Sequence, residues 1–364
     1  MNRRTFLTTA AGAGAALIAA PRSVRRAFAA RSGVELPRWR GFNITEKVGE
    51  RGRPFVESDF ALMAEFGFDF ARIPMSYWVW SDPASWFEID EEQLKEIDDV
   101  VEYGDKYDIH ISMNFHRIPG YCVNRRELEP MDLFEGPEEE QAEALRAARH
   151  HWEVFAERYK GIPSERLSFD LFNEPPWSDS EDRYVVIANS LVEGIRSKDP
   201  ERLIIADGLD IGQTPVYGII DLGVGQSTRG YLPKMVSHYT ATWVPENEFE
   251  SFERPTWPMV DKNGLEWNKD VLRQKLIAPW QRIAEEGVGI HVGEWGCFNR
   301  TPHETALAWM TDLLSLWQEA GWGYAMWNLR GSFGILDSGR EDVEYEDFRG
   351  HKLDRKMMEL LLAY

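Results

Sequence analysis

Short runs of consecutive apolar residues alternate along the chain with longer stretches in which apolar positions recur at helical spacing. Runs that are apolar on both faces are typical of parallel strands buried between two layers. Eight such runs predict strands at 40–44, 70–74, 109–116, 167–173, 203–207, 234–239, 289–294 and 323–329.

Helical patterns separate most of these runs. Asp90, followed three positions later by Gln93, has the capping-box spacing that opens a helix. A long helix is predicted over 138–159, and two further amphipathic patterns stop at Gly287 and Gly321, the residue type that most often ends a helix. The stretch between 207 and 234 has only a poor helical pattern interrupted by Gly and Pro.

Eight strands alternating with helices predict an α/β fold, a (β/α)8 TIM barrel in one domain. The chain has 364 residues, 43% of them hydrophobic, which is enough for one large core. It shows neither a linker-like stretch nor an internal repeat. A doubly wound open sheet is the alternative, but no Gly-x-Gly-x-x-Gly follows the first run to favour it.

The first 29 residues have the pattern of an export signal. Arg3-Arg4-Thr5-Phe6-Leu7 is a twin-arginine motif, a weakly apolar stretch covers 8–20, and Ala27-Phe28-Ala29 resembles a cleavage site. The apolar stretch is too short to span a bilayer stably. We therefore expect residues 1–29 to be a twin-arginine signal peptide and residues 30–364 to be the barrel domain. The mature protein is expected to be periplasmic or extracellular, without membrane insertion.

The formal charge of −20 argues against a nucleic-acid partner, since such a surface repels phosphate backbones. Cys122 and Cys297 are the only cysteines, and the sequence leaves open whether they are bonded. No Cys/His spacing suggests a zinc site, so neither a metal nor an organic cofactor is expected. Oligomeric state is also open.

Two glutamates stand at the ends of predicted strands. Glu174 follows the run 167–173, and Glu294 ends the run 289–294. Chemistry in such barrels sits at the carboxyl ends of the strands, so the two side chains are expected to share one cleft. Two carboxylates in one cleft are what a retaining glycosidase needs, one as acid and base and the other as nucleophile.

Other polar or aromatic residues fall at or near the ends of the predicted strands, in phase with the barrel pattern. They are Arg72, His116, Asn173, His238, Tyr239 and Trp327.

With these residues in place, the chain resembles glycoside hydrolase family 5, the cellulase-type retaining glycosidases of clan A. The sharpest motif is Asn173-Glu174-Pro175, which in that family holds the acid/base. Glu294 in Gly-Glu-Trp-Gly looks like the nucleophile. The resemblance covers the mature chain from Gly41-Phe42-Asn43 to Trp327 and implies hydrolysis of O-glycosidic bonds by double displacement.

The same resemblance implies the roles of the supporting residues. Arg72 looks like the arginine near the nucleophile, His116 like a histidine of the sugar-binding site, and Trp327 like the floor of the subsite for the attacked sugar. Asn173 is expected to bind the sugar 2-hydroxyl.

One departure concerns the sixth predicted strand. The family has His-x-Tyr there, with the tyrosine bonded to the nucleophile, whereas His238 is followed directly by Tyr239. Because alternate strand residues face opposite ways, Tyr239 is expected to reach Glu294 only if the strand ends or bulges.

Tryptophans near the predicted cleft are candidates for stacking on sugar rings: Trp78, Trp80, Trp177, Trp243 and Trp295. Their number favours an oligo- or polysaccharide substrate, and a β-linked glucan is the prediction. A β-mannanase or an exo-acting β-glucosidase of the same family is the alternative. An inactive carbohydrate-binding barrel would have lost one carboxylate, and a metal-dependent hydrolase would need converging ligands that the first strand lacks.

Overall fold

The computed structural model describes residues 34–49, 52–124, 126–176, 181–244 and 253–364. The predicted signal segment and Trp177 therefore lie outside the described residues. Among the described residues, no helix is long and apolar enough to cross a bilayer.

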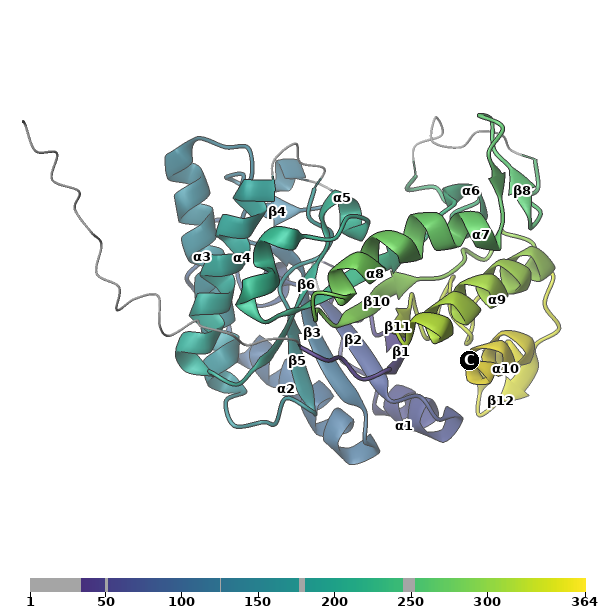
Figure 1. Ribbon diagram of the computed structural model, residues 1–364. Helices are drawn as coiled ribbons and strands as arrows, with labels where there is room; N and C mark the ends of the chain where they lie inside the picture. The colour runs from purple at the N-terminus through teal and green to yellow at the C-terminus, as the bar shows by residue number, and fades with distance from the viewer. Residues whose placement is uncertain (1–33, 50–51, 125, 177–180, 245–252) are drawn as a thin grey trace, which may run out of the picture.

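Eight parallel strands form a closed barrel with helices around it (Figure 1). The sheet closes because β1 pairs with β2 and β11, and β2 pairs with β3. This is the predicted TIM barrel. Its strands are β1 Arg40–Asn43, β2 Phe70–Ser76, β3 His110–Ile118, β5 Leu167–Asp170, β6 Leu203–Asp207, β7 Gly225–Gly230, β10 Ile290–Trp295 and β11 Gly323–Met326.

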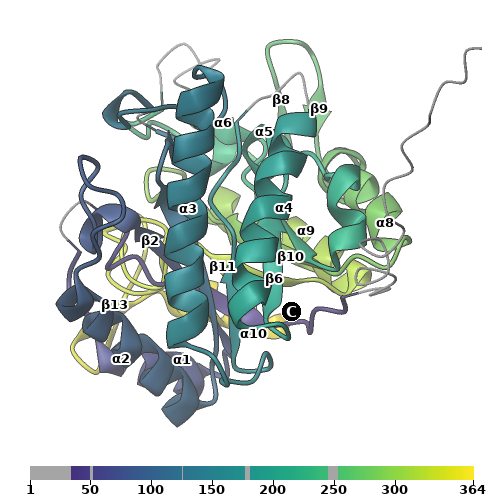
Figure 2. The same cartoon turned by 90° about the vertical axis from the view of Figure 1, so that its left-hand side faces the viewer.

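Helices of different length surround the barrel. Two of the long ones, α3 and α4, run side by side on its outside (Figure 2). The helices are α1 Glu57–Phe66, α2 Glu91–Tyr107, α3 Glu138–Arg158, α4 Glu181–Lys198, α5 Leu209–Gly212, α6 Lys234–Ser237, α7 Lys269–Leu272, α8 Ala278–Ala284, α9 His303–Ala320 and α10 Arg355–Ala363. A π-helical turn, Arg273–Ile277, joins α7 to α8.

Local sequence explains where these helices begin and end. The Asp90 side chain accepts hydrogen bonds from the backbone N–H groups of Glu92 and Gln93, so it caps α2 as predicted. Gly321 ends α9 with φ 75°, in the left-handed region that glycine adopts without strain.

In the described part of the chain, short antiparallel hairpins are added to the barrel. They involve β4 Tyr121–Cys122, which pairs with the end of β3, then β8 Met259–Val260 with β9 Glu266–Trp267, and β12 Glu346–Phe348 with β13 His351–Leu353. Cys122 and Cys297 are both buried and free.

The prediction of the sixth barrel strand was wrong. The strand is β7, Gly225–Gly230, while Lys234–Ser237 forms the short helix α6. The fifth connection, between β6 and β7, contains only α5 and the 3-10 helix Tyr217–Leu222. Because this connection has no helix that could cover β7 with apolar side chains, polar side chains of β7 form hydrogen bonds to its backbone.

Two side chains of β7 show this bonding. Gln226 donates to the carbonyl of Val216 at 2.8 Å and accepts from its N–H at 3.0 Å. Thr228 donates to the carbonyl of Gly212 at 3.2 Å. The strand is buried but carries no apolar run, and a search for apolar runs cannot find it.

Candidate active site

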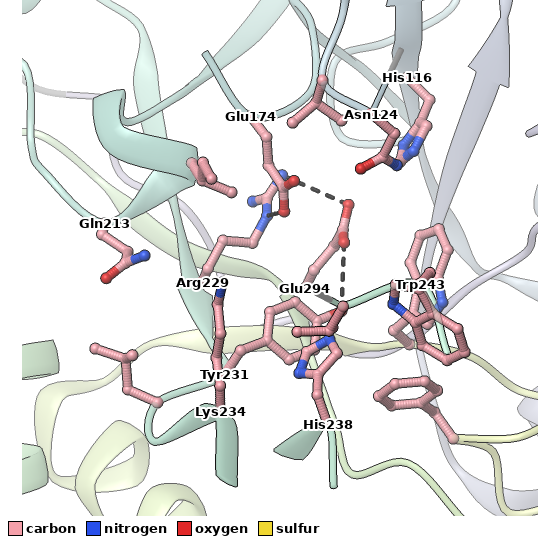
Figure 3. A pocket seen from close by; sticks show the side chains of 16 residues that line it. His116, Asn124, Glu174, Gln213, Arg229, Tyr231, Lys234, His238, Trp243 and Glu294 are labelled. Carbon is pink, nitrogen blue, oxygen red and sulfur yellow. Dashed lines mark hydrogen bonds and ion pairs between the residues drawn. The ribbon is translucent and has the colours of Figure 1, made fainter. Parts of the chain in front are cut away.

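A cavity of about 390 Å³ opens at the carboxyl ends of the barrel strands (Figure 3). This is the end at which TIM barrels carry their chemistry. Glu174 and Glu294 both line it. The other lining residues are His116, Val123, Asn124, Ile211, Gln213, Arg229, Tyr231, Leu232, Lys234, His238, Trp243, Val244, Trp327 and Phe333.

Glu174 follows β5 with its backbone in the left-handed region, at φ 49°. Such a conformation costs a non-glycine residue on the order of 1–3 kcal/mol and persists only when its surroundings hold it. Here the N–H of Glu174 donates to Asp207 Oδ2 at 2.9 Å, and its carbonyl accepts from the Tyr121 hydroxyl at 2.6 Å. These two contacts fix the direction in which the carboxyl group leaves the chain.

Glu294 lies near the end of β10, where the pairing of β10 with β7 shifts register between Val292 and Glu294. Such an irregularity re-aims the side chains of a strand. The carboxylate is buried, and its Oε1 accepts from Arg72 Nη1 at 2.6 Å. Its Oε2 accepts from the Tyr231 hydroxyl at 3.3 Å.

Arg229 contacts both carboxylates. Its Nε donates to Glu174 Oε1 at 3.0 Å, and its Nη2 lies 3.5 Å from Glu294 Oε1. Asp207 holds the other side of the guanidinium, accepting from Nη1 at 3.0 Å and from Nη2. The two glutamates therefore meet around one arginine on the same face of the barrel.

Arg72 lies beneath this group and is itself buried. Besides Glu294 it donates to Asp170 at 2.8 Å, and to the side-chain oxygens of Asn43 at 3.0 Å and Asn173 at 2.9 Å. The Asn173 oxygen also accepts from Arg229 at 2.8 Å. Among the described residues, the Asn173 amide nitrogen has no hydrogen-bond partner, so its donors remain available.

The surroundings of Glu174 favour a proton on its carboxyl group. Burial and the negative charge of Glu294 raise the pKa of Glu174 to about 7, although Arg229 acts in the opposite direction. The imidazole of His116 is kept neutral, because burial and nearby arginines lower its pKa well below the usual range. Burial and Lys234 also lower the pKa of His238, to about 4.

Most of the residues singled out from the sequence lie in this region. Glu174, Glu294, His116, His238, Trp243 and Trp327 line the cavity. Arg72 contacts Glu294, and Asn173 accepts hydrogen bonds from Arg72 and Arg229. The rings of His116 and Trp327 are stacked, with centroids 5.7 Å apart.

Tyr239 is not placed as expected. It lies in the turn after α6, and the hydroxyl that contacts Glu294 belongs to Tyr231, directly after β7. Arg229-Gly230-Tyr231 thus has the spacing sought at His238, with arginine as its first residue. Sequence reasoning missed Arg229, Tyr231 and Asp207, although a polar run that ends in Arg-Gly-Tyr could have indicated the first two.

Two of the candidate stacking tryptophans are in the core. Trp80 and Trp295 are fully buried, so neither exposes a ring face to a substrate, and the stacking predicted for them was wrong. Trp78 is partly buried, donates to Glu129 at 3.1 Å and does not line the cavity. Trp243 is 56% exposed and packs edge-on against Phe298 at the cavity wall.

Within the part of the chain that the structure describes, no group of three or more His, Cys, Asp or Glu side chains could hold a metal ion. Two unlike carboxyl groups in one cavity can transfer a proton and attack as a nucleophile.

Comparison with known proteins adds independent findings. The cellulase model of glycosyl hydrolase family 5 matches residues 30–332. Endoglucanase C from Acetivibrio thermocellus is 26% identical over 313 residues, which cover 80% of this chain and 89% of that protein. Cellodextrinase A from Ruminococcus flavefaciens is 24% identical over 280 residues, covering 75% of this chain and 78% of that protein.

Among solved structures, one described as a glycoside hydrolase is 37% identical, with a TM-score of 0.84. The match covers 90% of this chain and 99% of that chain. The similarity thus extends over the barrel and over the strand ends that carry both glutamates.

Proposed function

The chain belongs to glycosyl hydrolase family 5 and is a glycosidase, and from that premise we propose that it cleaves a β-linked glucan with retention of configuration. The observation that carries the proposal is the unlike pair of carboxyl groups around Arg229. Glu294 contacts two arginines and a tyrosine, whereas burial and charge repulsion raise the pKa of Glu174 to about 7. Such a division of environments separates a nucleophile from an acid.

In the proposed first step, Glu294 attacks the anomeric carbon as a carboxylate. Arg72 and Tyr231 hold its two oxygens and thereby orient the attack. Glu174 gives its proton to the leaving oxygen as the glycosidic bond breaks. The Asn173 amide nitrogen, which is without a protein partner among the described residues, supplies a donor for the sugar 2-hydroxyl.

In the second step, Glu174 accepts a proton from water while the water oxygen bonds to the anomeric carbon. The bond from that carbon to Glu294 breaks, and its electron pair returns to the Glu294 carboxylate. Double displacement of this kind requires carboxyl groups about 5–5.5 Å apart. Their contacts with a single guanidinium support such a short separation.

A glucan is supported by the cavity and by the names of the relatives. Trp243 and Trp327 both line the cavity, and the apolar C–H faces of sugars pack on such rings. The relatives named above are called an endoglucanase and a cellodextrinase. We also propose export by the twin-arginine route, on the pattern of residues 1–29.

The proposal is tested with Glu294→Gln, assayed on a panel of β-glucans, mannans and aryl β-glycosides. Loss of the nucleophile should lower kcat by a factor on the order of 10⁴ or more while the fold is kept. Glu139→Gln, at an exposed position on α3, is the matched control and should keep full activity.

Proton NMR of the wild-type reaction should show the β-anomer as the first product. An α-anomer formed first, or substantial turnover by Glu294→Gln, would refute the proposed mechanism. If only mannans were cleaved and mannose-type products released, a glucan would be refuted as the substrate.

A further inference from the structure

We propose that Arg229 is a positioning residue that makes Glu174 ionise once Glu294 has become esterified, so that Glu174 can act as a base in the second step. The inference rests on the proposed double displacement, because it needs an intermediate in which Glu294 carries no charge. It assigns the main effect of Arg229 to hydrolysis of that intermediate.

The guanidinium is held in place from several sides. Besides its contacts with the two glutamates and Asp207, Nη2 donates to Asn173 at 2.8 Å and Nη1 donates to Ser227 at 3.1 Å. Gly212 packs over its stem, where an added Cβ would meet Arg229 Cγ at 2.7 Å. Arg229 is buried, so its charge cannot turn to solvent when one of its anionic partners disappears.

Several charged or titratable groups act on the Glu174 carboxyl group, and they come from different strands. They are Glu294 on β10, Arg229 on β7, Asp207 on β6, Tyr121 on β4, and Tyr231 directly after β7. Arg229 is the cation among them that contacts the carboxyl group directly, through Nε at 3.0 Å. Glu294 and Asp207 both oppose ionisation of Glu174.

Esterification of Glu294 removes the larger of these two anionic effects and leaves Arg229 in place. The pKa of Glu174 must then fall, and the group ionises as the second step requires. Without Arg229, burial and Asp207 would both keep the proton on Glu174 in the intermediate. Water would then lack a base, and each unit of pKa would cost about tenfold in the ionised fraction.

The test is Arg229→Gln assayed with an aryl β-glucoside whose phenol is a good leaving group, because such a substrate needs little acid assistance in the first step. We expect a burst of about one equivalent of phenol per enzyme, followed by a steady state about tenfold slower than in the wild type. Added azide should speed the steady state, since azide attacks the anomeric carbon without needing a base.

A pH profile supplies a second readout. For this readout the substrate is a β-glucan, whose sugar leaving group needs the acid in the first step. Removing the cation should move the alkaline limb of its kcat/KM to higher pH, because Glu174 keeps its proton longer. Arg229→Lys, which keeps a positive charge, should show little burst and an alkaline limb close to that of the wild type. A merely structural role for Arg229 would lower activity in both variants without a burst, an azide response or a shifted limb, and that result overturns the proposal.

Should Arg229→Gln melt below the assay temperature, the double variant Arg229→Gln/Asp207→Asn carries the same test. It removes the buried anion together with its counter-charge, while burial still raises the pKa of Glu174. The burst and the azide response are expected there too, and their absence is equally decisive.

One control separates this inference from the proposed mechanism. A fluorinated glycoside that forms no covalent adduct with the wild-type chain would refute double displacement itself. Adduct formation by the wild type, with no burst in the glutamine variants, would refute only the role of Arg229.

Discussion

Glu174→Gln should stabilise the protein at neutral pH while it removes the acid and base of the reaction. Burial and the charge of Glu294 raise the pKa of Glu174 from 4.5 to about 7, so the folded chain resists ionising this group. Glutamine resembles the protonated acid in shape and carries no charge. The variant therefore lacks the cost that the wild type meets as its carboxyl group ionises.

The sign of the effect comes from proton binding. Between pH 4.5 and about 7, the folded state keeps a proton on Glu174 that the unfolded chain has released. The free energy of unfolding of the wild type must then fall as the pH rises through this window. A shift from 4.5 to about 7 corresponds to about 3 kcal/mol. The side chain is only 14% exposed, so solvent screens little of this.

The assay is urea unfolding of both proteins across the window, with the m-value monitored to confirm that the transitions are comparable. The stability difference in favour of Glu174→Gln should grow by about 3 kcal/mol between the acidic and the neutral end. Asp170, whose pKa is also raised to about 7, titrates in both proteins, so its contribution largely cancels.

Glu139→Gln, at an exposed position, is the control for the removal of one carboxyl group, and its effect on the free energy of unfolding should stay within about 0.5 kcal/mol. A difference between Glu174→Gln and the wild type that stays constant within about 1 kcal/mol across the window would refute the reasoning.

Three further variants test other parts of the site. Arg72→Met removes the cation that contacts the buried Asp170 carboxylate and leaves Glu294 with Arg229 alone, so we expect a loss of about 3–5 kcal/mol in urea unfolding; a loss below about 1 kcal/mol would contradict this. Tyr231→Phe removes the 3.3 Å hydrogen bond to Glu294 and should lower kcat about tenfold with an unchanged melting temperature, whereas unaltered kcat would exclude this role. Trp243→Ala should raise KM about threefold to tenfold for long glucans but not for short glycosides, and equal effects on both would argue against stacking.

The barrel could be predicted because most of its strands carry apolar side chains on both faces. The segment 203–207 coincides with β6, and the other apolar runs overlap their strands to within a few residues at each end. The helix start at Asp90 and the helix end at Gly321 were also confirmed, because both depend only on residues that are neighbours in sequence.

The sixth strand, β7, could not be predicted from an apolar run because its side chains include polar groups that form hydrogen bonds. Gln226 and Thr228 bond an irregular connection, and Arg229 serves the carboxylates. Meanwhile Met235 and Val236 of α6 are buried and gave an apolar run where no strand exists. Because this strand was predicted at the wrong place, the tyrosine that contacts Glu294 was predicted at Tyr239, eight positions beyond Tyr231.

The same limit applies to the site as a whole. That Glu174 and Glu294 end two strands follows from local pattern, and a barrel brings its strand ends to one face. Local pattern does not predict which side chains come into contact. Arg72 contacts Glu294 across a sequence separation of 222 residues, and Arg229 contacts Glu174 across 55. Such buried charges are held only by partners that the completed fold supplies, and removing one partner leaves the others uncompensated. Substituting either arginine should therefore lower stability and activity together, whereas Glu174→Gln should raise stability while it removes activity.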